Sequence, residues 1–175
     1  MEATAISSAT EMIVFGGLAN TGLPVSSGAR YNPVTNLWTT NGGTPPTARY
    51  LHTSVWTGSR MITWGGFANG TASPYLNTGS VYDPSGPTWT ATTATGAPPV
   101  RAMHTAVWNG SEMFIFGGYN GTAALNTGFA YKPAPSEAWR ALATLNAPSI
   151  RSGHTAVHIN KRMLIWGGVN GASYT

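Results

Sequence analysis

Short apolar runs, each followed by two glycines, recur along the chain. The first run is Ile-Val-Phe at 13–15, followed by Gly16 and Gly17. Runs this short with flanking glycine predict buried strands rather than helices. The pairs recur at steps of 49, 52 and 50 residues: Gly16 and Gly17, Gly65 and Gly66, Gly117 and Gly118, Gly167 and Gly168. A fixed step of about 50 residues indicates a repeat architecture.

Further motifs stand at fixed distances from each glycine pair. An alternating segment, Arg-x-x-His-Thr-(Ala/Ser)-Val, precedes the apolar run and predicts a strand. It supplies Arg49 and His52, Arg101 and His104, Arg151 and His154. Tyr-x-Pro and then a tryptophan follow, at Tyr31 and Trp38, Tyr82 and Trp89, Tyr131 and Trp139. Proline cannot donate to a strand ladder, so Tyr-x-Pro marks the end of a third strand, and a fourth begins near the tryptophan. Each unit is therefore predicted to hold four antiparallel strands. In this register, 136–142 is a strand although its composition suits a helix.

The first and last units are shorter than the middle ones. Aligning Met12 with Met163 places Ala3 at the position of His154, and the last unit stops before its third strand. We expect three complete four-stranded units and two strands of a fourth, 14 strands in all. The chain is then one array over 1–175, with units at approximately 1–48, 49–100, 101–150 and 151–175.

The amino-acid composition excludes some classes of protein but does not indicate a particular function. Only 8% of residues are charged, and 22 glycines and 12 prolines fit many tight turns between strands. The net charge of +4 has no basic run behind it, so we expect no nucleic-acid partner. The absence of cysteine excludes disulfides and thiolate chemistry. No apolar stretch is long enough to span a membrane, and Met1-Glu2-Ala3 does not begin a signal peptide.

The glycine pair, the Tyr-x-Pro and the tryptophan together resemble the kelch-repeat family. The strand His104-Thr105-Ala106-Val107-Trp108 is similar to strands of bacterial kelch arrays. This resemblance implies an all-β fold, a β-propeller whose blades are four-stranded sheets. It also implies that the first strand of each blade is innermost. An extracellular or cell-surface location is favoured by the resemblance alone.

The repeated arginines and histidines allow two interpretations. Arg49, Arg101 and Arg151 form either an arc at one channel mouth that binds carboxylate or phosphate groups, or a structural set that bonds carbonyls of the adjacent blade. Repetition in every complete blade favours the structural role. His52, His104 and His154 stand on separate blades, so we expect hydrogen-bonded structural histidines, no metal site and no cofactor.

Aromatic residues divide into repeated and non-repeated positions. The repeated tyrosines and tryptophans are expected to pack between blades. Four aromatics outside the repeat are the better binding candidates, because loops carry specificity: Tyr50, Phe67, Tyr75 and Tyr119. The glycine pairs lack a phosphate-loop pattern and are expected to end strands with a positive φ.

Three functions remain open. The first is a non-catalytic binding or scaffold module for a protein or glycan, which completes its propeller as a homo-oligomer or belongs to a longer array. The second is a kelch-like enzyme acting on sugar acids through an arginine-lined mouth. The third is a purely structural assembly or folding unit, such as an engineered propeller fragment. The first is favoured, because the few acidic residues, with Asp83 the only aspartate, do not suggest a catalytic carboxylate pair.

Overall fold

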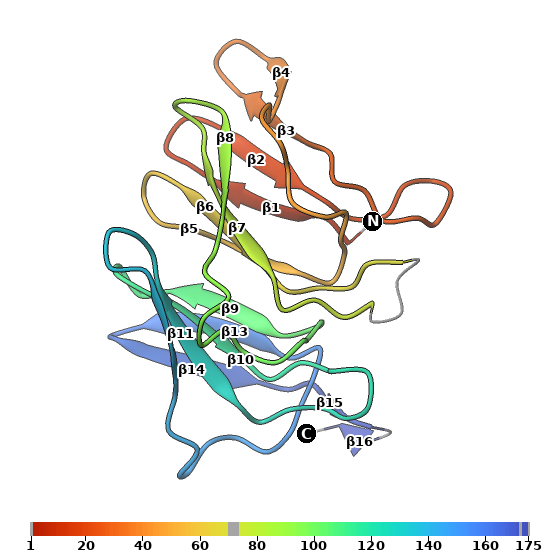
Figure 1. The fold of residues 1–175 in the computed structure, drawn as a ribbon, viewed down its shortest axis with the longest axis vertical. Helices are drawn as coiled ribbons and strands as arrows, with labels where there is room; N and C mark the ends of the chain where they lie inside the picture. The colour runs from red at the N-terminus through yellow and green to blue at the C-terminus, as the bar shows by residue number, and fades with distance from the viewer. Residues whose placement is uncertain (1, 70–73, 172, 175) are drawn as a thin grey trace.

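The computed structural model describes residues 2–69, 74–171 and 173–174, which form strands and connecting loops. Four sheets follow one another along the chain, from the first sheet in red and orange to the last in blue (Figure 1). The first sheet contains β1 (Thr4–Ser7), β2 (Met12–Phe15), β3 (Gly28–Asn32) and β4 (Leu37–Thr40). The second contains β5 (Thr53–Trp56), β6 (Met61–Trp64), β7 (Gly79–Asp83) and β8 (Thr88–Ala91). The described residues include no helix that could cross a membrane.

The second half of the chain repeats this plan and then shortens. The third sheet contains β9 (Thr105–Trp108), β10 (Met113–Phe116), β11 (Gly128–Lys132) and β12 (Ala138–Ala141). The fourth contains β13 (Thr155–Ile159) and β14 (Arg162–Trp166). The predicted all-β fold of three complete blades and a partial fourth is therefore confirmed. The segment 136–142 does contribute a strand, β12, because its tryptophan pairs with Tyr131 in the register of the other blades.

A short hairpin adds to the predicted strands. Its strands are β15 (Val169–Asn170) and β16 (Ser173–Tyr174), which bring the described total to 16. Earlier blades form isolated bridges in the same loop, such as that between Phe67 and Tyr75. The loop after the second strand of a blade therefore has its own local pairing, which the alternation pattern does not reveal.

Each complete sheet is antiparallel, with its strands in chain order from the innermost to the outermost. Tight turns set this order. In the β9–β10 turn, Gly110 has a φ of 101° and the Asn109 side chain accepts bonds from the Ser111 and Glu112 N–H groups. The first strands β1, β5, β9 and β13 contact one another in sequence. The sheets thus form an arc whose inner surface is made by the Arg-x-x-His-Thr strands.

The core lies between sheets. The aromatic residue before a glycine pair packs on the repeated tryptophan of the next blade. Phe15 lies 4.8 Å from Trp89, and Trp64 lies 5.3 Å from Trp139, measured between ring centroids. Phe15 and Trp64 are fully buried. These contacts make the first two of the three blade junctions continuous apolar layers, worth several kcal/mol each at roughly 25 cal/mol per Å² of apolar area removed from water.

The two ends of the arc expose the same residue types. Trp166 occupies the position of Phe15 and Trp64 in the last sheet, and 81% of it is exposed. Trp38 occupies the position of Trp89 in the first sheet, and 55% of it is exposed. Each tryptophan therefore lacks the neighbour that buries its counterparts at the inner junctions.

The glycine pair brings adjacent blades into close contact. Gly65 has a φ of 67°, and a Cβ added there would lie 2.6 Å from Cε1 of His104 and 2.9 Å from the carbonyl oxygen of Arg101. Gly16 and Gly117 have the same crowding against the next blade. At Gly167, with a φ of 68°, an added Cβ would meet nothing within 4 Å.

We expect Gly65→Ala to destabilise the chain more than Gly167→Ala. Both variants incur a left-handed backbone cost of about 1–2 kcal/mol, but only Gly65→Ala also overpacks a junction, which adds about 1–3 kcal/mol. The free energy of unfolding from urea titration measures the difference, at a concentration where the chain is monomeric. Equal losses would show that the Gly65 junction is not tightly packed.

Candidate functional site

The repeated arginines stabilise the blades from inside. The Arg49 side chain is fully buried. Its Nη1 donates to the carbonyl oxygens of Gly65 at 2.9 Å and Thr78 at 2.7 Å, and its Nε donates to Thr47 O. Gly65 and Thr78 belong to the arginine's own blade, whereas we expected a structural arginine to bond carbonyls of the adjacent blade. The guanidinium thus ties the loops at the end of one sheet.

Arg101 has the same environment one blade later. It is fully buried and donates to the carbonyl oxygens of Gly117 and Thr127, both at 3.0 Å. Arg151 is half-buried and donates to Gly167 O at 2.8 Å and to Ser149. Burial lowers the pKa of both Arg49 and Arg101 to about 10, so both remain charged at neutral pH. Their donors face carbonyls, which leaves no arginine-lined mouth formed by these two residues.

The adjacent blade is bound through the arginine main chain. The N–H of Gly66, the second glycine of its pair, donates to Arg101 O at 2.9 Å, and Gly17 N–H donates to Arg49 O at 2.8 Å. Gly118 donates to Arg151 O in the same way. Each arginine therefore supplies a side chain to its own blade and a carbonyl to the preceding one.

The repeated histidines bridge consecutive innermost strands. Nε2 of His52 lies 2.9 Å from Thr4 Oγ1, that of His104 lies 2.9 Å from Thr53 Oγ1, and that of His154 lies 2.7 Å from Thr105 Oγ1. All three rings are buried. Among the described residues, no three potential ligands are placed to hold a metal ion.

Burial keeps these histidines neutral. Desolvation, followed by the charge of Arg49, lowers the pKa of His52 to about 3. Desolvation and Arg151 lower the pKa of His154 to about 4. The pKa of His104 also falls well below its ordinary value, first because of burial and then because of Arg101 and the other two histidines. A neutral imidazole is consistent with a structural role in which Nε2 forms a hydrogen bond with the threonine hydroxyl.

The four non-repeated aromatics gather at one place, although they come from separate loops. Ring centroids are 5.3 Å apart for Tyr50 and Phe67, 4.9 Å for Phe67 and Tyr75, and 5.8 Å for Tyr75 and Tyr119. Every contact is edge-to-face, with interplanar angles of 65°, 88° and 65°. We call these four residues the aromatic cluster. All four are partly exposed.

The aromatic cluster spans the junction of the second and third blades. A Cβ added at Gly121 of the third blade would lie 3.0 Å from Cε2 of Tyr75, so this loop packs closely against the ring. Burial, and then the neighbouring Tyr119 and Tyr50, raise the pKa of Tyr75. Tyr75 is therefore uncharged at neutral pH, and the cluster combines apolar ring edges with hydroxyl groups.

One polar site was missed by the sequence analysis. Arg30 on β3 donates to Pro84 O at 3.0 Å across the first junction and pairs with Glu11 at 3.5 Å. The signal was present in the repeat, because Val81 and Ala130 hold the same position in the next two blades. A charged residue at a position that is apolar in the other blades indicates that Arg30 has polar partners of its own.

Successive four-stranded sheets joined through innermost strands define a β-propeller class of protein. A solved structure described as the structure of YjhT superposes with a TM-score of 0.76 and 19% identity, over 95% of this chain and 58% of that one. That likeness concerns the fold. The sequence model described as the KLHDC2/KLHL20/DRC7 Kelch-repeats domain matches residues 73–175. The chain belongs to the kelch-repeat family.

A curated relative is similar over part of the chain. The leucine-zipper-like transcriptional regulator 1 homolog of Drosophila melanogaster is 34% identical over 89 residues, or 48% of this chain. This chain spans only 9% of that relative. The fold and family fit a binding or scaffold module.

We expect acid to weaken the fold through the three buried histidines. Their folded pKa values lie below the ordinary 6.5, so the unfolded chain binds protons first and stability falls as the pH drops below 6.5 toward about 3 to 4. Each histidine contributes up to about 1.4 kcal/mol per pH unit. Urea titrations from pH 7.5 to 5 should show this slope, reduced by about one third in His104→Gln. An unchanged slope in the variant would contradict the assignment.

Proposed function

We propose that the chain is a non-catalytic binding module whose aromatic cluster contacts a protein partner. The observation that carries this proposal is the convergence of Tyr50, Phe67, Tyr75 and Tyr119, none of which the repeat requires. Aromatic residues with polar tips are enriched where protein interfaces concentrate their binding energy. The buried arginines favour this role over the sugar-acid enzyme, because they are bonded to carbonyls.

The geometry of the cluster suits a rigid docking surface. Edge-to-face packing holds each ring against its neighbour, and such pairs contribute about 0.5–1.5 kcal/mol beyond their buried area. A partner that covers the cluster therefore orders few side chains, which lowers the entropic cost of binding. A glycan that stacks on the same rings is the competing occupant.

Replacing Tyr75 with alanine is expected to weaken partner binding by about 30-fold or more, since Tyr hot spots are worth about 2 kcal/mol or more. Leu23→Ala is the matched control, because Leu23 is a 56% exposed apolar residue in the corresponding loop of the first blade. Affinity capture identifies a candidate partner, and calorimetry with the purified partner gives the affinities. Equal losses in both variants, or binding only to a glycan array through Tyr75, would overturn the protein-partner assignment.

We also propose that the open ends of the arc associate between copies. Trp166 and Trp38 hold the positions of the two partners in the aromatic contact of the first two junctions, and both are exposed. Head-to-tail packing would place Trp166 of one copy against Trp38 of the next. Ala3 stands at the histidine position of the first strand, so this junction lacks a histidine bridge and relies on the tryptophans.

Trp166→Lys and Trp38→Lys are each expected to abolish self-association measured by native mass spectrometry and light scattering. Mixing the two variants should restore one junction and yield a heterodimer, because each retains the end that the other has lost. Val34→Lys, at a residue that is 90% exposed, serves as the control and should associate like the original chain. A monomer at every concentration of the unmodified protein would refute association between copies.

A further inference from the structure

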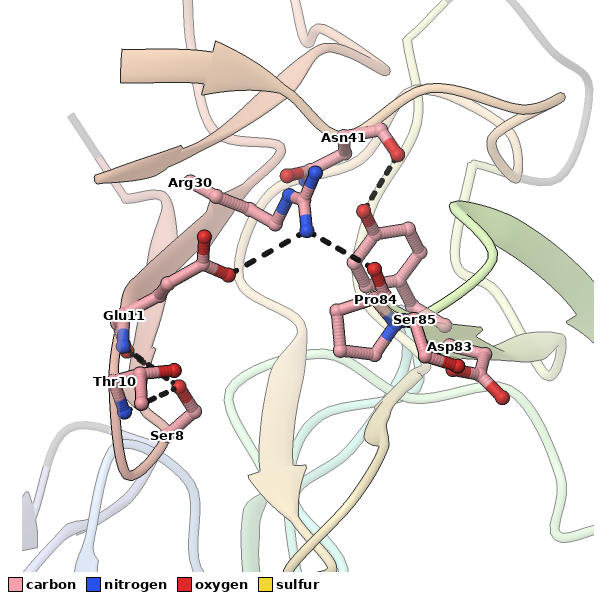
Figure 2. Close-up of polar contacts among 9 residues, drawn as sticks. Ser8, Thr10, Glu11, Arg30, Asn41, Asp83, Pro84 and Ser85 are labelled. Carbon is pink, nitrogen blue, oxygen red and sulfur yellow. Dashed lines mark hydrogen bonds and ion pairs between the residues drawn. The ribbon is translucent and has the colours of Figure 1, made fainter. Parts of the chain in front are cut away.

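An arginine crosses the first blade junction but has no counterpart at the second. Figure 2 shows Arg30 reaching from the first blade to the Pro84 carbonyl oxygen of the second, with Glu11 beside it. The Arg30 side chain is 17% exposed, so its guanidinium is largely enclosed between the blades. The space between the first two blades therefore accommodates a guanidinium that bonds to a carbonyl and a carboxylate.

The corresponding residue of the second blade is Val81. Arg30 pairs in register with Ile13, and Val81 pairs with Ile62, the same position of the second strand. Pro133 corresponds to Pro84, since each follows a repeated tyrosine by two residues. The shorter valine leaves a cavity of about 200 Å³ at the second junction, with Val81 on one side and Tyr131, Pro133, Ala134 and Glu137 on the other.

The cavity retains acceptors for a cation. Glu137 accepts a hydrogen bond from Thr93 N–H at 2.8 Å and another from the Tyr131 hydroxyl, and it has no ion-pair partner among the described residues. Three other acidic residues pair with arginine: Glu11 with Arg30, Asp83 with Arg60 and Glu112 with Arg140. Because Arg60 and Asp83, which also line the cavity, offset each other, Glu137 gives the site a net negative charge.

We propose that this cavity binds the guanidinium group of an arginine from a partner peptide. At the first junction a guanidinium meets a proline carbonyl of the next blade and a glutamate of its own blade. At the second junction Arg60 holds the position of Glu11, and the next blade supplies both the Pro133 carbonyl and the glutamate, Glu137. A planar guanidinium can donate to the Pro133 carbonyl and the Glu137 carboxylate together, whereas an ammonium group lacks this fixed fork. The site lies on strands and turns other than those of the aromatic cluster, so the two proposals are independent.

The test uses N-acetyl-arginine amide and, as a neutral probe of similar shape, N-acetyl-citrulline amide. NMR titration of the whole chain should give saturable shifts at Ala134 and Val81 with the arginine probe only. Glu137→Gln should weaken binding about tenfold, the usual scale for losing a charge-assisted hydrogen bond of about 1.4 kcal/mol. Val81→Arg should abolish binding, because the chain then fills its own cavity as Arg30 does.

Two controls keep the outcomes distinct. Tyr75→Ala should leave the arginine probe's affinity unchanged, which separates this site from cation–π contact with the aromatic cluster. If Val81→Arg does not fold, Glu137→Gln alone decides. The proposal is overturned if the arginine probe gives no saturable shift at millimolar concentration, if the citrulline probe binds equally well, or if Glu137→Gln binds as the unmodified chain does.

Discussion

At the second and third glycine pairs, the peptide between the two glycines links the hydrogen bonding of one blade to that of the next. Its carbonyl, from the first glycine, accepts from the buried arginine of its own blade, as Gly65 does from Arg49 at 2.9 Å. Its N–H, from the second glycine, donates to the next arginine's carbonyl, as Gly66 does to Arg101 at 2.9 Å. One planar unit thus connects a charged side chain to the following blade. A charge-assisted bond on the carbonyl also polarises the peptide and strengthens its N–H as a donor.

This link explains why the repeat needs its residues together. In the first three pairs, a side chain at the first glycine would collide with the next histidine and arginine carbonyl, so the glycine is required by close approach as well as by its φ. A buried guanidinium is costly unless its donors are paired, and the loop carbonyls of Gly65 and Thr78 pair those of Arg49. The neutral histidine then joins innermost strands through threonine without adding a second buried charge.

The residues that carry the two binding proposals lie at positions where the repeat varies. The aromatic cluster uses loop positions that hold other residues in other blades, and the junction positions Arg30 and Val81 differ although their frames are the same. A propeller scaffold held by its own arginines and glycines can therefore change its loops and outer junctions without losing the fold. The repeated residues thus stabilise the fold, and the positions that vary between blades are those of the proposed binding sites.

The sequence alone determined the architecture: strand order, blade number and the partial last sheet follow from the spacing of glycine pairs, because pattern and turn chemistry are local. It also identified Tyr50, Phe67, Tyr75 and Tyr119 as binding candidates, but not that they gather into one cluster. Only the tertiary structure decided that Arg49 and Arg101 face carbonyls of their own blades, and that Val81 leaves a cavity where Arg30 fills one. The direction of these side chains and the space between blades depend on how neighbouring sheets pack. The order of residues within one repeat does not specify that packing.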